Sequence, residues 1–165
     1  MSEPLGFDIR YTHVSDAPYV LQWLKEPGIQ QWFPVSLDKE IEDAVQCWVG
    51  FCKYNSSLTA TIDGVPVGIG TLFLMPYRKV AHHCLFKLLV DPAHQRKGVG
   101  RALLKNLKHL AKNGFRLELM HIEIFEGNPI ESLLLQFNFH EYGRQEHFVK
   151  DKDRYLGRIL YESYL

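Results

Sequence analysis

The residues most suited to binding a ligand are clustered at positions 95–101, where two glycines lie among basic and amide side chains. They are Gln95, Arg96, Lys97, Gly98, Val99, Gly100 and Arg101. A mostly apolar run over residues 85–90 precedes them and stops at Asp91 and Pro92, as a buried strand ending in a loop would. After them, apolar residues recur at helical spacing over residues 99–111, with a plausible stop at Gly114. The glycines are therefore predicted at a strand-to-helix turn.

Such a turn is suited to phosphate. The first turn of a helix has free backbone N–H groups at the positive end of its dipole, and these bind phosphate oxygens. Glycine permits close approach, while Arg96, Lys97 and Arg101 add charge-assisted contacts. The spacing Q-x-x-G-x-G differs from a Walker loop and from the dinucleotide fingerprint G-x-G-x-x-G. We predict a phosphate cradle of another kind; the alternative is a basic turn that serves packing alone.

The spacing and its context resemble the pyrophosphate-binding motif of the GCN5-related N-acetyltransferase (GNAT) superfamily, in which Q/R-x-x-G-x-G/A opens the third main helix. A second similarity covers residues 125–139, which resemble the family's fifth strand, fourth helix and Gly-Phe entry to the next strand. Asn138 stands where Gly is usual, and Asn is the next-best residue for a left-handed backbone. The resemblance spans essentially the whole chain and implies acetyl-CoA as co-substrate, with no metal.

The resemblance also implies where acetyl-CoA would bind. It would lie where the fourth and fifth strands splay apart, with its pantetheine paired to the fourth strand like an added strand. Backbone groups of Leu88, Leu89 and Val90 would hold the pantetheine and the acetyl carbonyl, and Asn128 would contact the pantetheine arm. An N–H near Val90 would stabilise the oxyanion, and one such donor is worth roughly 3 to 4 kcal/mol in other enzymes.

The acid of the expected reaction is harder to assign. Direct attack by an amine requires the substrate ammonium to lose a proton and the departing CoA sulfur to gain one. The family often uses a tyrosine on the fourth helix as the acid, but Leu134 stands at that position. Tyr142, on the following strand, is the nearest tyrosine in sequence and is our candidate acid.

The candidate bases lie on the strand predicted over residues 117–125. His121 and Glu123 share one face of that strand because side chains alternate. The alternative interpretation is that both are solvated positions on a half-buried strand.

Other residues with reactive, metal-ligating or aromatic side chains have simpler interpretations. His82 and His83 face opposite ways on an extended chain and have no third ligand at suitable spacing, so no metal site is predicted. Cys84 is predicted to be an inert buried thiol. Trp32 and Phe33, in a loop, either wall an amine pocket through cation–π contacts or pack into the core.

The composition of the chain argues against several classes of function. The chain has 165 residues, enough for one domain over residues 1–165, and it is 46% apolar and 23% charged with zero formal net charge. Without a basic block, nucleic acid is not an expected partner. The first residues lack a long apolar segment, so we expect no signal peptide and no membrane partner. Three cysteines without C-x-x-C pairing fit reduced thiols, and the expected location is cytoplasmic.

The elements expected along the chain complete the fold prediction. Strands are predicted at residues 7–13, 58–62, 65–74, 85–90, 117–125, 139–149 and 155–164, and helices at 17–24, 37–54, 99–111 and 129–137. Predicted caps are Ser15 or Asp16 for the first helix, Ser36 for the second and Asn128 for the last. This order predicts an α/β (α+β mixed) fold, with a mixed, mostly antiparallel sheet of about seven strands flanked by about four helices.

The sequence thus predicts an acetyl-CoA-dependent N-acetyltransferase. The acceptor would be a primary amine, such as a small amine, an aminoglycoside-like compound or a protein N-terminus. The alternative is a non-catalytic acyl-CoA-binding module that lost the usual acid. Dimers are frequent in the superfamily, which leaves a homodimer open.

Overall fold

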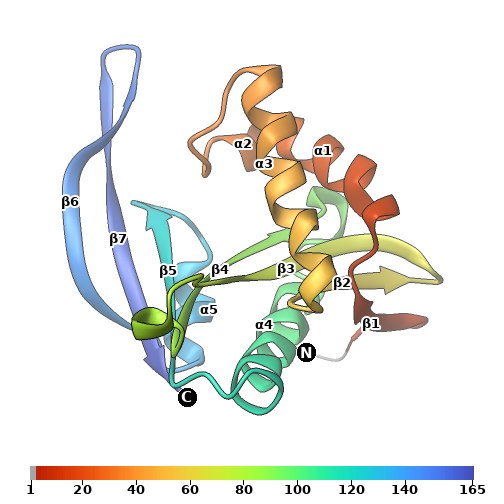
Figure 1. Cartoon of the computed structure of the whole chain (residues 1–165). Helices are drawn as coiled ribbons and strands as arrows, with labels where there is room; N and C mark the ends of the chain where they lie inside the picture. The colour runs from red at the N-terminus through yellow and green to blue at the C-terminus, as the bar shows by residue number, and fades with distance from the viewer. Residues whose placement is uncertain (1–2) are drawn as a thin grey trace.

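The computed structural model describes residues 3–165, which form a mixed seven-stranded sheet with helices on both faces (Figure 1). In spatial order the strands are β1 (Phe7–Tyr11), β2 (Ser57–Ile62), β3 (Val65–Leu74), β4 (His83–Val90), β5 (Leu119–Phe125), β7 (Arg154–Tyr164) and β6 (His140–Asp151). The α-helices are α1 (Ala17–Lys25), α2 (Pro27–Gln30), α3 (Asp38–Gly50), α4 (Val99–His109) and α5 (Glu131–Gln136). Neighbouring strands are antiparallel except β4 and β5, so the predicted fold class is confirmed.

The sheet separates two hydrophobic cores. Successive side chains of a strand point to opposite faces, and β4 shows this directly. Leu88 packs into the cluster that α4 and α5 cover, whereas Leu89 packs into the cluster that α1, α2 and α3 cover. The central strands are therefore held from both sides.

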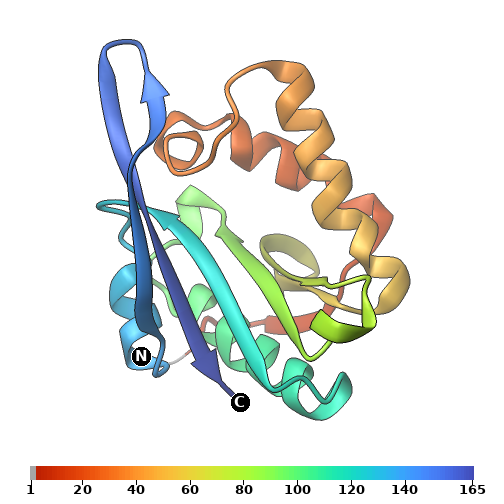
Figure 2. The same ribbon diagram turned by 60° about the vertical axis from the view of Figure 1, so that its left-hand side comes forward.

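Strands β4 and β5 are paired at one end only. Their parallel register ends at Leu85 and His121. Beyond that point β4 stays with β3 as far as Val90, and β5 stays with β7 as far as Phe125. The two strands diverge, as predicted, and within residues 3–165 no strand covers the far half of this β4 edge (Figure 2).

Two backbone predictions in tight turns are confirmed. The β2–β3 hairpin turns through Asp63 at φ +50° and Gly64 at φ +82°, the positive angles expected of a primed turn. Asn138 has φ +63°, the left-handed conformation that the family's glycine would adopt.

The predicted cap of the first helix is wrong. A short 3-10 turn, Val14–Asp16, precedes α1, and neither Ser15 nor Asp16 caps α1 with its side chain. The Asp16 carboxylate instead accepts hydrogen bonds from the Arg10 guanidinium at 2.8 Å and from the His13 backbone N–H at 2.9 Å. A buried ion pair outcompetes the cap at this position.

Two later helix boundaries also differ from prediction. Helix α3 follows Leu37 rather than Ser36, because the Glu40 carboxylate accepts the N–H of both residues, and it ends at Gly50 before a 3-10 turn, Phe51–Tyr54. Helix α5 begins two residues later than predicted. Asn128 Oδ1 accepts the N–H of Ile130 at 3.0 Å and so closes a turn before the helix starts.

Close packing of α4 on the sheet gives a test of the fold. A Cβ added at Gly70 in β3 would lie 2.5 Å from Leu107 Cδ1 and 3.2 Å from Leu88 Cδ1, and Leu107 is fully buried. We expect Gly70→Ala to lower the free energy of unfolding by roughly 1 to 3 kcal/mol, the usual cost of overpacking. Urea titration measures the change. Gly50→Ala is the control, since a Cβ there meets nothing within 4 Å. Equal stability of Gly70→Ala and the wild type would contradict this packing.

Candidate functional site

The uncovered edge of β4 presents backbone hydrogen-bonding groups to the gap between β4 and β5. The Asp91 N–H donates to the Val67 carbonyl of β3 at 2.8 Å, and backbone polar groups alternate sides along a strand. Leu89 therefore directs its N–H and C=O to β3, whereas Leu88 and Val90 direct theirs into the gap. This edge is suited to an extended ligand that carries amide groups, in the manner of strand addition.

The turn between β4 and α4, which the sequence predicts to be a phosphate cradle, lies beside that edge. Arg96 at φ +62° and Gly98 at φ +85° both adopt the left-handed conformation. Ala102 donates to the Gly98 carbonyl at 3.0 Å, so the amides before Ala102 precede the helix's own hydrogen bonds. These amides point out of the helix N-terminus, where the dipole favours negative charge.

Gly100 joins the cradle to the gap. A Cβ placed on it would lie 3.6 Å from the Val90 side chain, 3.7 Å from Leu88 and 3.8 Å from Leu133, which are ordinary contact distances. The protein itself therefore leaves room for a methyl group at this position, and a larger side chain would extend into the end of the gap.

The polar side chains predicted for phosphate binding lie around the same turn. Gln95, Arg96, Lys97 and Arg101 are all exposed. Gln95 donates to the Val90 carbonyl at 3.4 Å, and Arg101 donates to Gln136 at 2.7 Å across to α5. The three basic residues give the cradle positive charge without an ion-pair partner among the described residues.

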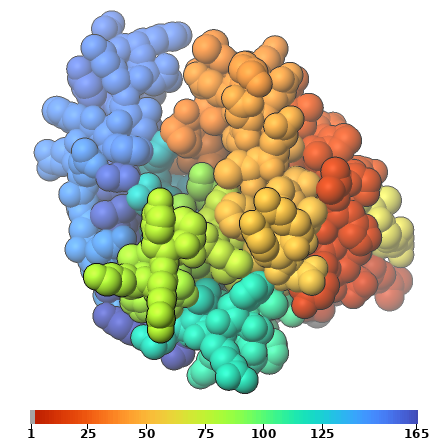
Figure 3. Space-filling model, in the orientation of Figure 1, coloured from red at the N-terminus to blue at the C-terminus, as the bar shows by residue number. Residues whose placement is uncertain are grey.

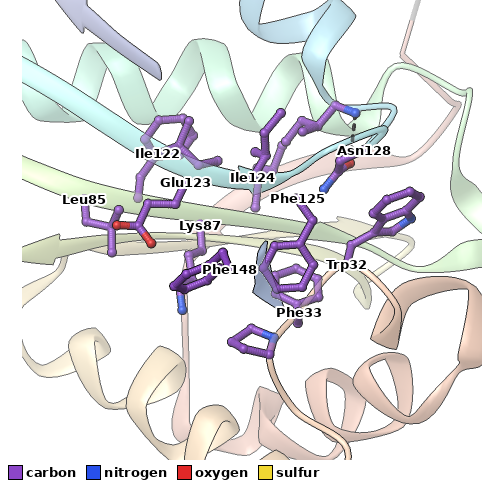
Figure 4. Close-up of a pocket in the computed structure, with 14 residues that line it drawn as sticks. Trp32, Phe33, Leu85, Lys87, Ile122, Glu123, Ile124, Phe125, Asn128 and Phe148 are labelled. Carbon is purple, nitrogen blue, oxygen red and sulfur yellow. Dashed lines mark hydrogen bonds between the residues drawn. The ribbon is translucent and has the colours of Figure 1, made fainter. Parts of the chain in front are cut away.

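A small cavity of about 130 Å³ lies where β4 and β5 diverge (Figure 4). Its walls are mainly apolar: Trp32, Phe33, Pro34, Leu85, Phe86, Leu88, Ile122, Ile124, Phe125, Ile130 and Phe148, with Lys87, Glu123 and Asn128 as the polar members. A groove of about 770 Å³ adjoins it, and the two linings share Trp32, Phe33, Pro34, Phe125 and Phe148. This groove runs between the β6–β7 hairpin and the α2–α3 segment, which stand apart in the space-filling view (Figure 3).

Two charged side chains line the cavity, and only one of them has a counter-ion. Glu123 Oε2 lies 2.9 Å from the Arg158 guanidinium, which also stacks over the Phe148 ring at 4.2 Å. The Lys87 ammonium has no ion pair within the described chain and lies 5.4 Å and 5.9 Å from the ring centroids of Phe73 and Trp48. Burial lowers the pKa of Lys87, although Cys47 and Glu123 oppose the change.

His121 and Glu123 share a face of β5, as predicted, but only Glu123 lines the cavity. His121 lies at the last paired position, where its Nε2 is 3.1 Å from His83 Nδ1. Burial and the neighbouring His83 lower the pKa of His121, against the opposing influence of Glu123 and Glu162. The lowered pKa favours the neutral imidazole near pH 7, which is the form that accepts a proton.

Tyrosines are absent from the described cavity lining. Leu134 is fully buried in the core. Tyr142 lies on β6 at a bulge and is about half exposed, and burial together with Glu123 and Glu162 raises its pKa. Tyr161 points to the opposite face of the sheet, where it donates to Glu131; burial and that bond raise its pKa to about 12. Neither phenol belongs to the described cavity lining.

Lys87, Arg158 and Phe148 lie at or beside the cavity but are not among the residues predicted from the sequence. Lys87 was visible as the one charged residue within the apolar run at 85–90. Arg158 and Phe148 come from the β6–β7 hairpin, whose position over β5 depends on pairing between distant segments. Cys84 behaves as predicted: burial raises its pKa to about 12, which makes it a poor nucleophile.

One known protein family matches most of this chain. The sequence model of the GNAT acetyltransferase family matches residues 17–139. Comparison with curated proteins gives no match. Among solved structures, yncA from Salmonella typhimurium, described with its cofactor acetyl-CoA, is 18% identical, with TM-score 0.76 over 96% of this chain and 94% of that one.

Two further structures show the same fold. Ribosomal-protein-alanine N-acetyltransferase from Brucella melitensis is 21% identical, with TM-score 0.77 over 96% of this chain and 99% of that one. A GNAT-family acetyltransferase from Streptococcus pneumoniae is 17% identical, with TM-score 0.77 over the same shares. At these identities the likeness concerns the fold, while the sequence match covers most of the chain. The chain belongs to the GNAT family of acetyltransferases.

Proposed function

We propose that this chain transfers an acetyl group from acetyl-CoA to a primary amine by direct attack. One observation carries the proposal: the turn at the start of α4, with its free amides, adjoins the open edge of β4, and both lie beside a small, mainly apolar cavity. A ligand with phosphates at one end and amides along its length matches this sequence of features. Acetyl-CoA is such a ligand, and its thioester supplies the activated acetyl group.

The proposed acetyl-CoA contacts are assigned from the positions of the backbone amides and side chains described above. The phosphates would lie on the amides of Gly98, Val99, Gly100 and Arg101, with Gln95, Arg96 and Lys97 beside them. Leu88 and Val90 would hold the pantetheine and the acetyl carbonyl through their gap-facing backbone groups. We do not include Leu89 among these backbone contacts, because its N–H and C=O are directed to β3.

Asn128 would contact the pantetheine arm with its carboxamide. Its Oδ1 is occupied by the Ile130 N–H, and it lines the cavity from the β5–α5 turn (Figure 4). The amide nitrogen is therefore the group offered to the ligand.

His121 would accept the proton of the substrate ammonium. The Glu123 carboxylate, on the same face of β5, is already engaged by the Arg158 guanidinium at 2.9 Å, whereas the lowered pKa of His121 favours its neutral imidazole near pH 7. Tyr142 would donate a proton to the departing sulfur, since its raised pKa keeps the phenol protonated.

We expect His121→Gln to lower kcat by about 100-fold or more, the usual contribution of a general base. In the wild type, activity should rise with pH through a pKa below the ordinary histidine value and then level off, because the neutral imidazole is the active form. The variant should lose this acid limb. His109→Gln, on the exposed surface of α4, is the matched control. An acid limb that survives in His121→Gln would contradict the assignment.

A second function is favoured by one observation: Leu134, fully buried, occupies the position where the family often has its tyrosine acid. This favours a non-catalytic module that binds acyl-CoA. The test is to incubate the protein with acetyl-CoA and a panel of primary amines, and to follow free thiol. Thiol release that depends on the amine supports the enzyme. Tight acetyl-CoA binding without any release supports the module.

We also propose a single domain over residues 1–165 that acts in the cytoplasm without nucleic acid, membrane or metal. The free thiols of Cys47, Cys52 and Cys84 and the zero net charge support this setting. None of the described helices has both the length and the apolar content to cross a bilayer. We also propose that the chain can form a homodimer, and analytical ultracentrifugation measures its oligomeric state.

A further inference from the structure

The charge of the cavity indicates the kind of acceptor. Its two charged lining residues are Lys87 and Glu123, and the Glu123 carboxylate is already neutralised by Arg158 at 2.9 Å. Arg158 is itself fixed by Gln145, whose Oε1 accepts from its Nε at 2.9 Å. Among the described residues, Lys87 is therefore the charged member of the cavity lining that has no ion-pair partner.

The Lys87 side chain is partly buried beside the cavity. It lies in the middle of β4, opposite Thr71 of β3, and its side chain points to the face that carries Leu85 and Glu123 (Figure 4). Its ammonium rests over Phe73 and Trp48 rather than in open solvent. Half-buried cations are ordinarily matched by a carboxylate, and an anion brought by a ligand would supply that match.

The acidic residues near α3 do not offset this charge. Asp43 pairs with Lys39 at 2.8 Å, Asp38 lies 3.9 Å from Lys25, and Glu40 accepts backbone N–H groups at the start of α3. None of the three lines the cavity or its adjoining groove in the described chain. An acceptor with several cationic groups would thus meet a cation at the reacting end of the site.

We propose that the acceptor is a small amine that also carries a carboxylate or similar anion within a few bonds of its nitrogen, and that Lys87 binds this anion. Lys87 is one residue from Leu88, whose backbone faces the gap, so the anion and the amine would be separated by a short spacer. The aromatic walls formed by Phe33 and Phe148 would pack against the rest of the acceptor. This assignment rests on the acetyltransferase function proposed above.

The test uses amines in matched pairs that differ only by the carboxylate: alanine with ethylamine, leucine with isoamylamine, and phenylalanine with phenethylamine. Thiol release gives kcat/KM for each, and thermal shift with the corresponding N-acetyl products in the presence of CoA gives binding. We expect the carboxylated member to be preferred at least tenfold in one pair. Lys87→Met should remove that preference, mainly by raising KM for the amine that carries the carboxylate. Lys87→Arg should retain the preference because it retains the charge.

Two controls separate the possible failures. Lys53→Met removes a lysine that also lies over an aromatic ring, Tyr54 at 4.9 Å, but outside the cavity, and it should leave the preference intact. The thermal shift with acetyl-CoA is measured on every variant. If the wild type shows no shift with acetyl-CoA, the proposed function fails. If acetyl-CoA binds but neither rate nor product binding distinguishes any pair, or Lys87→Met leaves the preference intact, the role of Lys87 is overturned while the proposed function stands.

Discussion

Gly100→Glu should abolish the stabilisation of this protein by acetyl-CoA. The glutamate side chain would extend from the first turn of α4 toward Val90 and Leu88, into the end of the gap, and would bring a negative charge to the place proposed for phosphate. At a concentration 100 times its dissociation constant, a ligand that binds only the folded chain adds about 2.7 kcal/mol of stability. For a chain of this size that corresponds to roughly 5 to 11 °C in Tm. The variant should show no such shift.

Gly100→Ala separates a blocked site from a damaged fold. The added methyl group meets its neighbours at 3.6 Å or more, so the protein tolerates it, and alanine is the better helix former by about 1 kcal/mol. This variant should show an unchanged or higher Tm in the absence of ligand and should lose less of the acetyl-CoA shift than Gly100→Glu. A Gly100→Glu protein that folds and responds to acetyl-CoA like the wild type would remove the cradle from the site.

Asp16→Ala should lower the free energy of unfolding by about 3 kcal/mol. The Asp16 carboxylate is only 3% exposed and accepts two hydrogen bonds from Arg10 at 2.8 Å, one from the Thr59 hydroxyl at 2.9 Å and one from the His13 N–H. Removing one partner of a buried pair costs roughly 3 to 5 kcal/mol, and partial exposure of Arg10 favours the lower end. Asp38→Ala, at an exposed pair, should cost less than about 1 kcal/mol.

The Asp16 effect should depend on pH. Burial raises the pKa of Asp16, but the bonds from Arg10, His13 and Thr59 outweigh it, and the net result is a lowered pKa. The folded state therefore holds the carboxylate ionised more strongly than the unfolded state does. Its contribution is fully present above the unfolded pKa, about 3.9, and is lost as pH falls through the folded value. Urea unfolding of wild type and variant between pH 7 and pH 3 measures this; a constant difference across that range would contradict it.

The fold was predictable from local signals because each of its main turns has a distinct residue requirement. Asp63-Gly64 and Asn138 need positive φ angles, and Pro92 ends β4 before the Gly98 turn. Helix starts were less predictable, because a cap depends on which nearby group reaches the free amides first. At Asp16 the competitor was Arg10, and before α3 it was Glu40, three residues after the cap position.

The candidate site likewise has one part that could be predicted from the sequence and one part that could not. The proposed cradle is one continuous segment, residues 95–101, so a local sequence pattern is enough to predict it. The cavity walls come from the α2–α3 loop, β4, β5 and the β6–β7 hairpin, and only the folded chain brings Lys87, Glu123 and Phe148 together (Figure 4). The hydrogen bond between His83 and His121 depends on the short parallel register of β4 and β5, which no spacing in the sequence specifies.

The most direct measurement is a calorimetric titration of the purified wild-type chain with acetyl-CoA, with CoA and dephospho-CoA as comparisons. We predict saturable binding of acetyl-CoA to a single site on each chain, with affinity that weakens as salt increases because phosphates contact Arg96, Lys97 and Arg101. The absence of binding by acetyl-CoA and by CoA at low salt would contradict the account and leave the GNAT fold without its cofactor.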